Sequence, residues 1–177
     1  FTYDPEVAVK VRDRSFQLLV NETYEYLVAK PLISEKTIEE VKKHAVREVF
    51  VYHILIGYSD SGLRNPPSRS RAEALLRAQS VRSKYLDGTD IKELAKKFSD
   101  DPSAISNGGE LGWLGWGSSV QEFQLAAFSL NKEILSDPLQ TNFGYHLILV
   151  EKDRPSSLSF LSEDAFEDAV FNLSKST

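Results

Sequence analysis

Two histidines lie inside strongly apolar segments, where a side chain that donates, accepts and titrates is chemically distinctive. His53 belongs to the run YHILI and His146 to the run YHLILV. Both runs predict buried strands, in which alternate side chains share a face. This alternation places His53 on the face of Val51 and His146 on the face of Ile148.

Two interpretations of these histidines stay open. A buried imidazole must find hydrogen-bond partners, so both can be satisfied core histidines. Alternatively, they pair across adjacent central strands and support a site. The third histidine, His44, lies in VKKHAVRE on a polar face of a predicted helix, where we expect it to be solvated. Because no two histidines have a metal-ligand spacing and cysteine is absent, no metal site is expected.

The remaining polar candidate is Asp101, which precedes Pro102 in the loop SDDPSAISNGGE. Aspartate is common in such turns, so a turn-forming role and a functional carboxylate are both open. Phe123 falls on the inward stripe of a predicted helix. Trp113 and Trp116 fall in a glycine-rich turn, where they either pack or contact an extended peptide. The sequence has no Walker loop, no dinucleotide-binding glycine motif and no nucleophile elbow.

These side chains belong to a central zone that begins with the strand VFVYHILI. A loop rich in Gly, Pro and Ser follows, and then two helices that start at a capping box on Ser70 and an acidic cap on Asp90. LGWLGWG predicts a short strand, residues 120–130 a third helix, and residues 138–141 and 145–150 two further strands. The order is typical of an α+β domain with a small four-stranded mixed sheet covered by helices.

Helical segments flank this zone, so we divide the chain into residues 1–47, 48–154 and 155–177. The first predicted helix has an apolar stripe at helical spacing, made of Phe16, Leu19, Val20, Thr23 and Leu27. The second begins at Ser34 and has on one side Ile38, Val41, Ala45 and Val49. The C-terminal helix has on one side Phe166, Val170 and Leu173.

Composition narrows the function classes. The chain has 177 residues and a formal net charge of −5, which argues against nucleic-acid binding. No apolar run approaches the roughly 20 residues that span a membrane, and the N-terminal stretch FTYDPEVAVKVRDR is not a secretory signal. Since methionine is absent even at position 1, we expect a piece of a longer protein, in whose missing parts a membrane anchor would lie. The absence of cysteine suits an oxidising envelope compartment.

Four segments taken together resemble the parvulin family of peptidyl-prolyl cis–trans isomerases, also called rotamases. In chain order they are YHILI, LAKKFSDDPSAISNGGELGWLGWG, EFQLAAFSL and DPLQTNFGYHLILVEKD. They cover residues 52–153, nearly the whole central zone, in the family's order and spacing. The resemblance implies the parvulin fold, no cofactor, and non-covalent action on X–Pro bonds of unfolded or extended proline-containing polypeptides.

The resemblance also implies residue roles. His53 and His146 would be paired strand histidines beneath the site, Thr141 the hydroxyl bonded to that pair, and Asp101 the acid beside the reacting peptide bond. The residues implied to bind substrate line or flank the prolyl pocket: Leu111, Trp113, Leu114, Ser119 and Phe123. Ser119 departs from the family, which usually has a methionine there.

The main hypothesis is an isomerase that assists the folding of exported proteins in the periplasm or cell envelope. The alternative is a weakly active or inactive parvulin-shaped module that binds clients as a chaperone, which Ser119 and the flanking helices favour. A third interpretation is a scaffold or dimerisation element. The loop after His53 carries Arg64, Arg69 and Arg71, which leaves phosphate recognition open against a plain solvated loop.

Overall fold

The computed structural model describes residues 10, 13–20 and 33–174. Phe16, Leu19 and Val20 of the predicted N-terminal stripe lie in a helix over residues 13–20 and are exposed. Thr23 and Leu27, the other members of that stripe, lie outside the described residues. Among the described residues, no helix combines the length and apolar character needed to cross a membrane.

The centre of the molecule is a four-stranded sheet with the order β2-β1-β4-β3. Its strands are β1 (Arg47–Ile56), β2 (Glu110–Gly115), β3 (Leu139–Thr141) and β4 (Gly144–Pro155). The α+β class is confirmed, but the expectation of a mixed sheet is wrong, because every strand pair is antiparallel. The connection from β1 to β2 contains several helices instead of one crossover helix. It brings the chain back to the end of β1, where the Asp100 amide donates to the Leu55 carbonyl.

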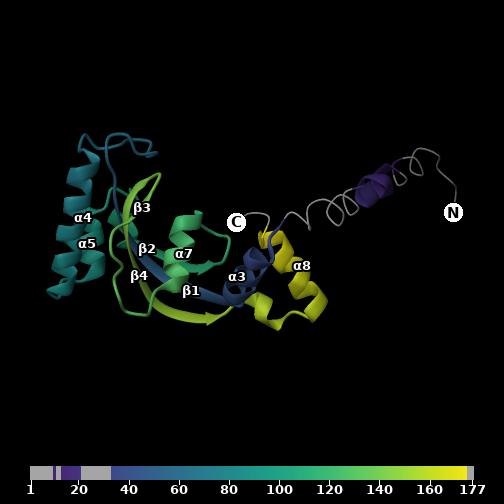
Figure 1. Ribbon diagram of the computed structural model, residues 1–177. Coiled ribbons are helices and arrows are strands. Elements are labelled where there is room, and N and C mark those ends of the chain that lie inside the picture. The colour runs from purple at the N-terminus through teal and green to yellow at the C-terminus, as the bar shows by residue number, and fades with distance from the viewer. Residues whose placement is uncertain (1–9, 11–12, 21–32, 175–177) are drawn as a thin grey trace.

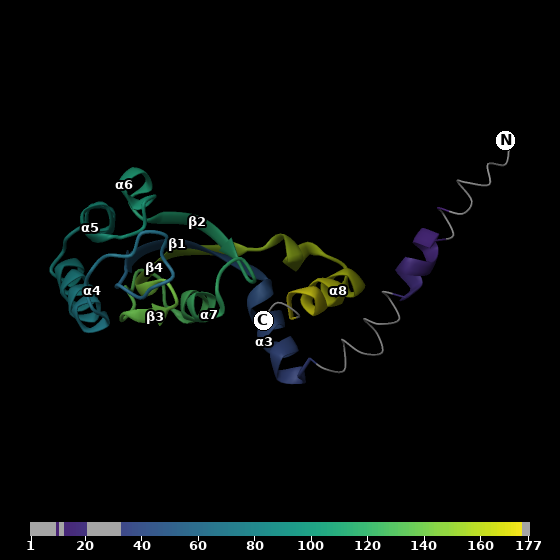
Figure 2. The same ribbon diagram turned by 90° about the horizontal axis from the view of Figure 1, so that it is seen from above.

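One face of the sheet is covered by α4 (Arg71–Leu86) and α5 (Ile91–Phe98), as Figures 1 and 2 show. Both start as predicted. The Ser70 side chain and Glu73 form a reciprocal capping box, and the Asp90 carboxylate accepts from two amides of the first turn of α5. The loop predicted to follow α5 contains one further short helix, α6 (Ala104–Asn107).

The other face is covered by α7 (Gln121–Ser129), and beyond it by α3 (Glu35–Ala45) and α8 (Glu163–Ser174), which follows the 3₁₀ helix η2 (Ser157–Phe160). These helices share one hydrophobic cluster with the sheet. Its fully buried members are Val41, Ala45, Val49, Val51, Trp116, Phe123, Ala127, Phe128, Ile148, Val150 and Val170. Both flanking helices are therefore part of the folded core. Val49, predicted on the second helix, belongs to β1 instead.

His44 corrects a second expectation. Its side chain is only 6% exposed, and its ring stacks on the Trp116 indole at a centroid distance of 4.6 Å. The lysines beside it suggested a solvated helix face. However, α3 is packed on two sides, since α8 covers one side and the segment that carries Trp116 covers another. The predicted solvation of His44 is wrong for this reason.

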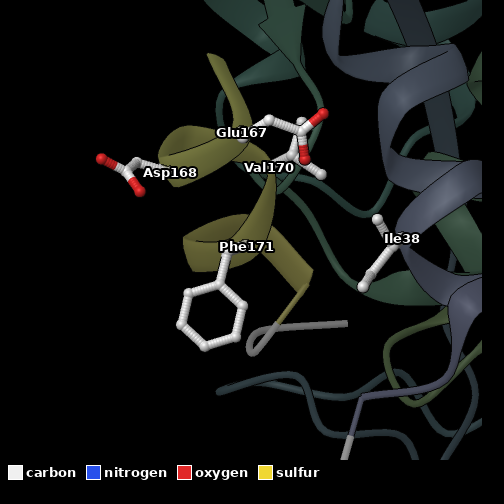
Figure 3. A pocket seen from close by; sticks show the side chains of 5 residues that line it. All are labelled: Ile38, Glu167, Asp168, Val170 and Phe171. Carbon is white, nitrogen blue, oxygen red and sulfur yellow. The ribbon is translucent and has the colours of Figure 1, made fainter. Parts of the chain in front are cut away.

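The contact between α3 and α8 leaves a small pocket of about 70 Å³, shown in Figure 3. Ile38 of α3 faces α8, whose Val170 and Phe171 line the opposite wall. At its rim Lys42 Nζ lies 2.5 Å from Glu167 Oε1, although both side chains are substantially exposed. The pair is therefore expected to contribute at most about 1 kcal/mol, and apolar packing accounts for most of this interface.

Candidate active site

The two strand histidines meet on the face of the sheet that α7 covers. In the antiparallel pairing of β1 with β4, Leu55 lies opposite His146 and His53 lies opposite Ile148, so the two imidazoles are diagonal neighbours. Their Nδ1 atoms are 3.4 Å apart, and the rings stack at 5.6 Å with 21° between their planes. The histidines are therefore paired, which is the second of the two interpretations left open by the sequence.

Each imidazole uses its second nitrogen to reach a further polar side chain. His53 Nε2 lies 2.8 Å from Asp101 Oδ2, and His146 Nε2 lies 2.9 Å from Thr141 Oγ1. The Phe143 amide donates to the same hydroxyl oxygen at 3.1 Å. The four residues expected to form the catalytic set thus form one continuous chain of hydrogen bonds.

With both imidazoles neutral and Asp101 ionised, one assignment of protons satisfies every atom of this chain. The Thr141 hydroxyl donates to His146 Nε2, which fixes the proton of His146 on Nδ1, and that proton is donated to His53 Nδ1. The proton of His53 is then on Nε2 and is donated to the Asp101 carboxylate. Both imidazoles are neutral in this arrangement, and the single charge of the chain lies on Asp101.

The electrostatics agree with that assignment. Burial lowers the pKa of His146 from its ordinary 6.5 to about 3, and the nearby His53 acts in the same direction. The hydrogen bond from His53 holds the pKa of Asp101 well below its ordinary value, and bonds from Ser103 add to the effect against the opposing influence of burial. The site therefore presents a fixed carboxylate above a neutral, buried base.

The loop that carries Asp101 is fastened to the end of β1. Ser99 Oγ accepts from the amides of Leu55 and Asp101, at 3.1 and 3.2 Å. Ser103 clamps the carboxylate itself, since its amide and its hydroxyl donate to Asp101 Oδ1 at 2.9 and 2.8 Å. Asp101 is consequently held by its backbone and by both carboxylate oxygens.

A second set of hydrogen bonds near the end of β1 involves the neighbouring acid, Asp100. The Asp100 carboxylate accepts from the Gly57 amide at 2.8 Å and forms an ion pair with Arg69, whose guanidinium also donates to the Gly57 carbonyl at 3.1 Å. Both side chains of this ion pair are mostly shielded, with 22% and 21% exposed. Arg69 thus ties the loop after β1 to the segment that carries Asp101.

Close backbone approach beneath the site requires a glycine. Gly109 accepts the His53 amide at 2.8 Å and has a φ of +78°. A Cβ atom at this position would lie 2.3 Å from the His53 carbonyl oxygen. Any larger residue would therefore push the strand that carries His53 out of place.

Of the residues expected to bind substrate, Phe123 contacts the histidine pair directly. Its ring meets both imidazoles edge-on, with centroid distances of 5.9 Å to His53 and 5.3 Å to His146. Leu111 is left unpaired at a β-bulge opposite Val51 and Tyr52, and is 36% exposed. The side chains of Phe123 and Leu111 come from α7 and β2, on either side of the pair.

The other residues expected to bind substrate are placed differently. Ser119 is half-buried in the turn before α7. Leu114 packs against the cluster beneath α7 and α3. Trp113 lies opposite Phe50 on the other face of the sheet, where their rings meet edge-on at 5.3 Å and the Arg154 guanidinium lies 4.1 Å from the indole centroid. The structure does not bring Trp113 to the histidine pair.

The arginines of the loop after His53 are spread apart. Arg69 is committed to Asp100, Arg71 pairs with Asp60 at 3.3 Å, and Arg64 is exposed. Two of the three guanidinium groups are thus paired with carboxylates of the protein, which favours the solvated-loop interpretation over phosphate recognition.

Sequence reasoning missed Ser99, Ser103 and Asp100, and it considered Arg69 only for phosphate recognition. All four lie in polar loops, and their only signal was proximity in sequence to Asp101 or to the loop after His53. Within the described ranges, no group of three or more His, Asp or Glu side chains is arranged to hold a metal ion.

Comparisons with known proteins extend these observations. The family model for the PPIC-type PPIase domain matches residues 36–154. The foldase protein PrsA of Geobacillus kaustophilus is 44% identical over 92 residues, which are 51% of this chain and 33% of that protein. The chaperone SurA of Cupriavidus metallidurans is 36% identical over 130 residues, 72% of this chain and 25% of that protein. The chain thus spans about a third or less of these relatives.

Among solved structures, peptidylprolyl isomerase PrsA from Bacillus cereus matches with a TM-score of 0.60 and 22% identity. The match covers 99% of this chain and 68% of that one, and establishes a shared fold.

Proposed function

Because the chain belongs to the PPIC-type peptidyl-prolyl isomerase family, we propose that it accelerates cis–trans rotation about X–Pro bonds of extended polypeptides. One observation carries the proposal: Asp101, His53, His146 and Thr141 form a single hydrogen-bonded chain, with the Phe123 ring against both imidazoles. These are the residue types and the arrangement that the parvulin resemblance implies.

Rotation about an X–Pro bond requires no nucleophile. Resonance keeps the peptide bond planar and sets a rotation barrier of about 18–20 kcal/mol. Rotation is accelerated by any environment that favours the twisted amide over the planar one. In the planar form, negative charge accumulates on the carbonyl oxygen. A carboxylate fixed near that oxygen disfavours the planar form and lowers the barrier.

Asp101 supplies that carboxylate. Its pKa is held low by His53 and Ser103, so it is ionised at neutral pH. Because burial lowers the pKa of His146 to about 3, that imidazole places no positive charge beneath the site at neutral pH. Leu111, which is 36% exposed, offers apolar surface to the proline ring, and the buried Phe123 ring supports the imidazoles beside it, which orients the bond against the carboxylate.

The direct test measures exchange between the cis and trans forms of an X–Pro peptide by NMR. We expect the full chain to accelerate exchange and Asp101→Ala to reduce kcat/KM at least about tenfold. Asp137→Ala is the matched control, because its side chain is 89% exposed at a distant loop. Undiminished exchange in Asp101→Ala, with wild-type folding, would contradict the mechanism.

A second candidate function has a specific observation in its favour. Ser119 gives the pocket less apolar surface than a methionine would, and the exposed helix over residues 13–20 presents apolar side chains. Both suit a module that holds unfolded clients and catalyses weakly. We place either activity in the cell envelope, supported by the absence of cysteine.

A further inference from the structure

A second cleft, separate from the histidine pair, opens where α3, β1 and α7 meet. It has a volume of about 430 Å³ and is lined by Lys43, His44, Arg47, Phe128 and Ser129. That volume lies within the range of clefts that bind small ligands. Three of the five lining residues are basic, although the whole chain carries a net charge of −5.

His44 gives this cleft an unsatisfied polar group. The residue is 6% exposed, and its Nδ1 is buried without a hydrogen-bond partner. Its ring is fixed between the stacked Trp116 and the edge of Phe128, at centroid distances of 4.6 and 5.7 Å. Because these rings shield that nitrogen from solvent, a ligand in the cleft acts on the His44 ring through its charge and not through a hydrogen bond to Nδ1.

The two permanent cations are available to a ligand. Arg47 uses one nitrogen to donate to the Phe128 carbonyl, and its guanidinium lies 5.6 Å from the centroid of the Phe128 ring. Lys43 is exposed and forms no ion pair among the described residues. Two acids interact electrostatically with these groups. Asp153 acts on Arg47 but is paired with Lys132 at 2.8 Å, and Glu40, one turn before His44, acts on that ring.

We propose that this cleft binds a carboxylate group carried by an extended polypeptide. Arg47 and Lys43 supply charge and N–H donors, and the exposed Ser129 supplies a hydroxyl group at the same cleft. The site lies outside the isomerase machinery but on the same helix: Phe123 and Phe128 are about 7.5 Å apart along the axis of α7. A client that continues past the histidine pair along α7 advances about 3.3 Å per residue, so a few further residues cover the axial part of the separation.

The test uses the full chain and reads the His44 ring by NMR as pH is varied. Burial, Lys43 and Arg47 all lower the pKa of His44, against Glu40. A carboxylate bound beside the ring favours the protonated form, so binding raises that pKa. Three tetrapeptides serve as probes: one with an internal glutamate and an amidated end, its glutamine counterpart, and a glutamine peptide with a free C-terminal carboxylate.

We expect the glutamate peptide, the free-acid peptide or both to raise the pKa of His44, and the neutral amide to leave it unchanged. Which of the two acts tells whether a side chain or a chain end is bound. Inorganic phosphate is run in parallel. Equal binding of the neutral amide, no response to either carboxylate at millimolar concentration, or a response to phosphate alone would overturn the proposal.

Matched lysine variants locate the site. Lys43→Gln is expected to weaken peptide binding about fivefold, whereas Lys36→Gln, an exposed lysine elsewhere on α3, should change it less than twofold. Both variants should keep the wild-type rate of X–Pro exchange, because neither lysine touches the histidine pair. Equal weakening by both would show that general charge, and not this cleft, attracts the peptide.

Discussion

Ser119 is half-buried in the turn that leads into α7, beside the helix that supplies Phe123. A serine at this position offers little apolar surface to a proline ring. Ser119→Met adds several buried methylene-sized groups, each worth about 0.8 kcal/mol when fully buried. We expect the variant to lower KM for an X–Pro peptide about three- to tenfold, as measured by NMR exchange.

Ser80→Met on the exposed face of α4 is the control for this change, since it adds the same side chain away from the site. If Ser119→Met leaves KM and kcat/KM unchanged, the native pocket is already complete, and Ser119 does not limit the activity.

The buried histidines set a pH dependence of stability. The pKa of His146 is lowered from 6.5 to about 3 in the folded chain. Between these two pH values, the unfolded chain binds a proton at His146 and the folded chain does not. The free energy of unfolding is therefore expected to fall as pH falls, by about 2 kcal/mol between pH 7 and pH 5 from this residue alone. His44, with its lowered pKa, acts in the same direction.

Urea unfolding at pH 7 and pH 5 measures this loss, and the imidazole signals of His146 report its state directly. Asp101 does not contribute in that window, because its pKa lies below 3.8 in the folded chain. In His44→Phe the loss should shrink but persist. A His146 ring that titrates near pH 6.5 in the folded protein would contradict the assignment.

At this residue scale, strand alternation fixed the face of His53 and of His146 within each strand. Their pairing stayed open, because it depends on strand order and register, and the family resemblance implied it. It could not place His44, whose surroundings come from two distant segments, α8 and the turn at Trp116. Asp101 came from the family resemblance, and nothing in its own sequence distinguished it from a turn residue.

At the scale of elements, Arg69 joins two loops at the end of β1. Its guanidinium binds the Asp100 carboxylate and the Gly57 carbonyl, and Asp100 in turn accepts from the Gly57 amide. Arg69→Gln leaves a partly buried carboxylate without its cation. We expect a loss of about 1–3 kcal/mol in the free energy of unfolding and a three- to tenfold lower kcat/KM, because Asp101 is less firmly held.

Arg64→Gln is the matched control for Arg69→Gln, since Arg64 lies exposed in the same loop. Chemical denaturation and NMR exchange are measured for both. If the two variants behave alike, the loop does not position Asp101. Phosphate recognition by this loop is tested with the wild type. Equal affinities for phosphorylated and plain Ser-Pro peptides would exclude it.

The starts of the helices could be predicted from local sequence signals. The helix starts at Ser34, Ser70 and Asp90 are all confirmed, because capping depends on side chains within three residues. Two features of the fold were not predicted. The helix α6 is a single short turn within a polar loop, and the strand directions depend on how several helices return the chain, which no local pattern encodes.

At the scale of the whole molecule, the flanking helices share one hydrophobic core with the sheet. The α3 and α8 helices contribute Val41, Ala45 and Val170 to the same cluster as Val49 of β1. A boundary between residues 47 and 48 follows the change from helix to strand, but it cuts through a shared core. Removing the flanking helices would expose Trp116 and Val49, so the isolated sheet domain is a poor test of their function.

Substitutions in the full chain test the client-holding function without that damage. Phe16 and Leu19 lie on one side of the helix over residues 13–20, and each is 61% exposed. If this stripe holds unfolded clients, Phe16→Ser with Leu19→Ser should weaken the suppression of client aggregation at least about threefold, measured by light scattering. Leu76→Ser with Leu86→Ser removes equally exposed leucines from α4 and should leave suppression unchanged. X–Pro exchange should be unaffected in both, because neither pair touches Asp101. Equal protection by all three proteins would assign client binding to another surface, and a parallel loss of exchange would mean that the stripe acts through the fold.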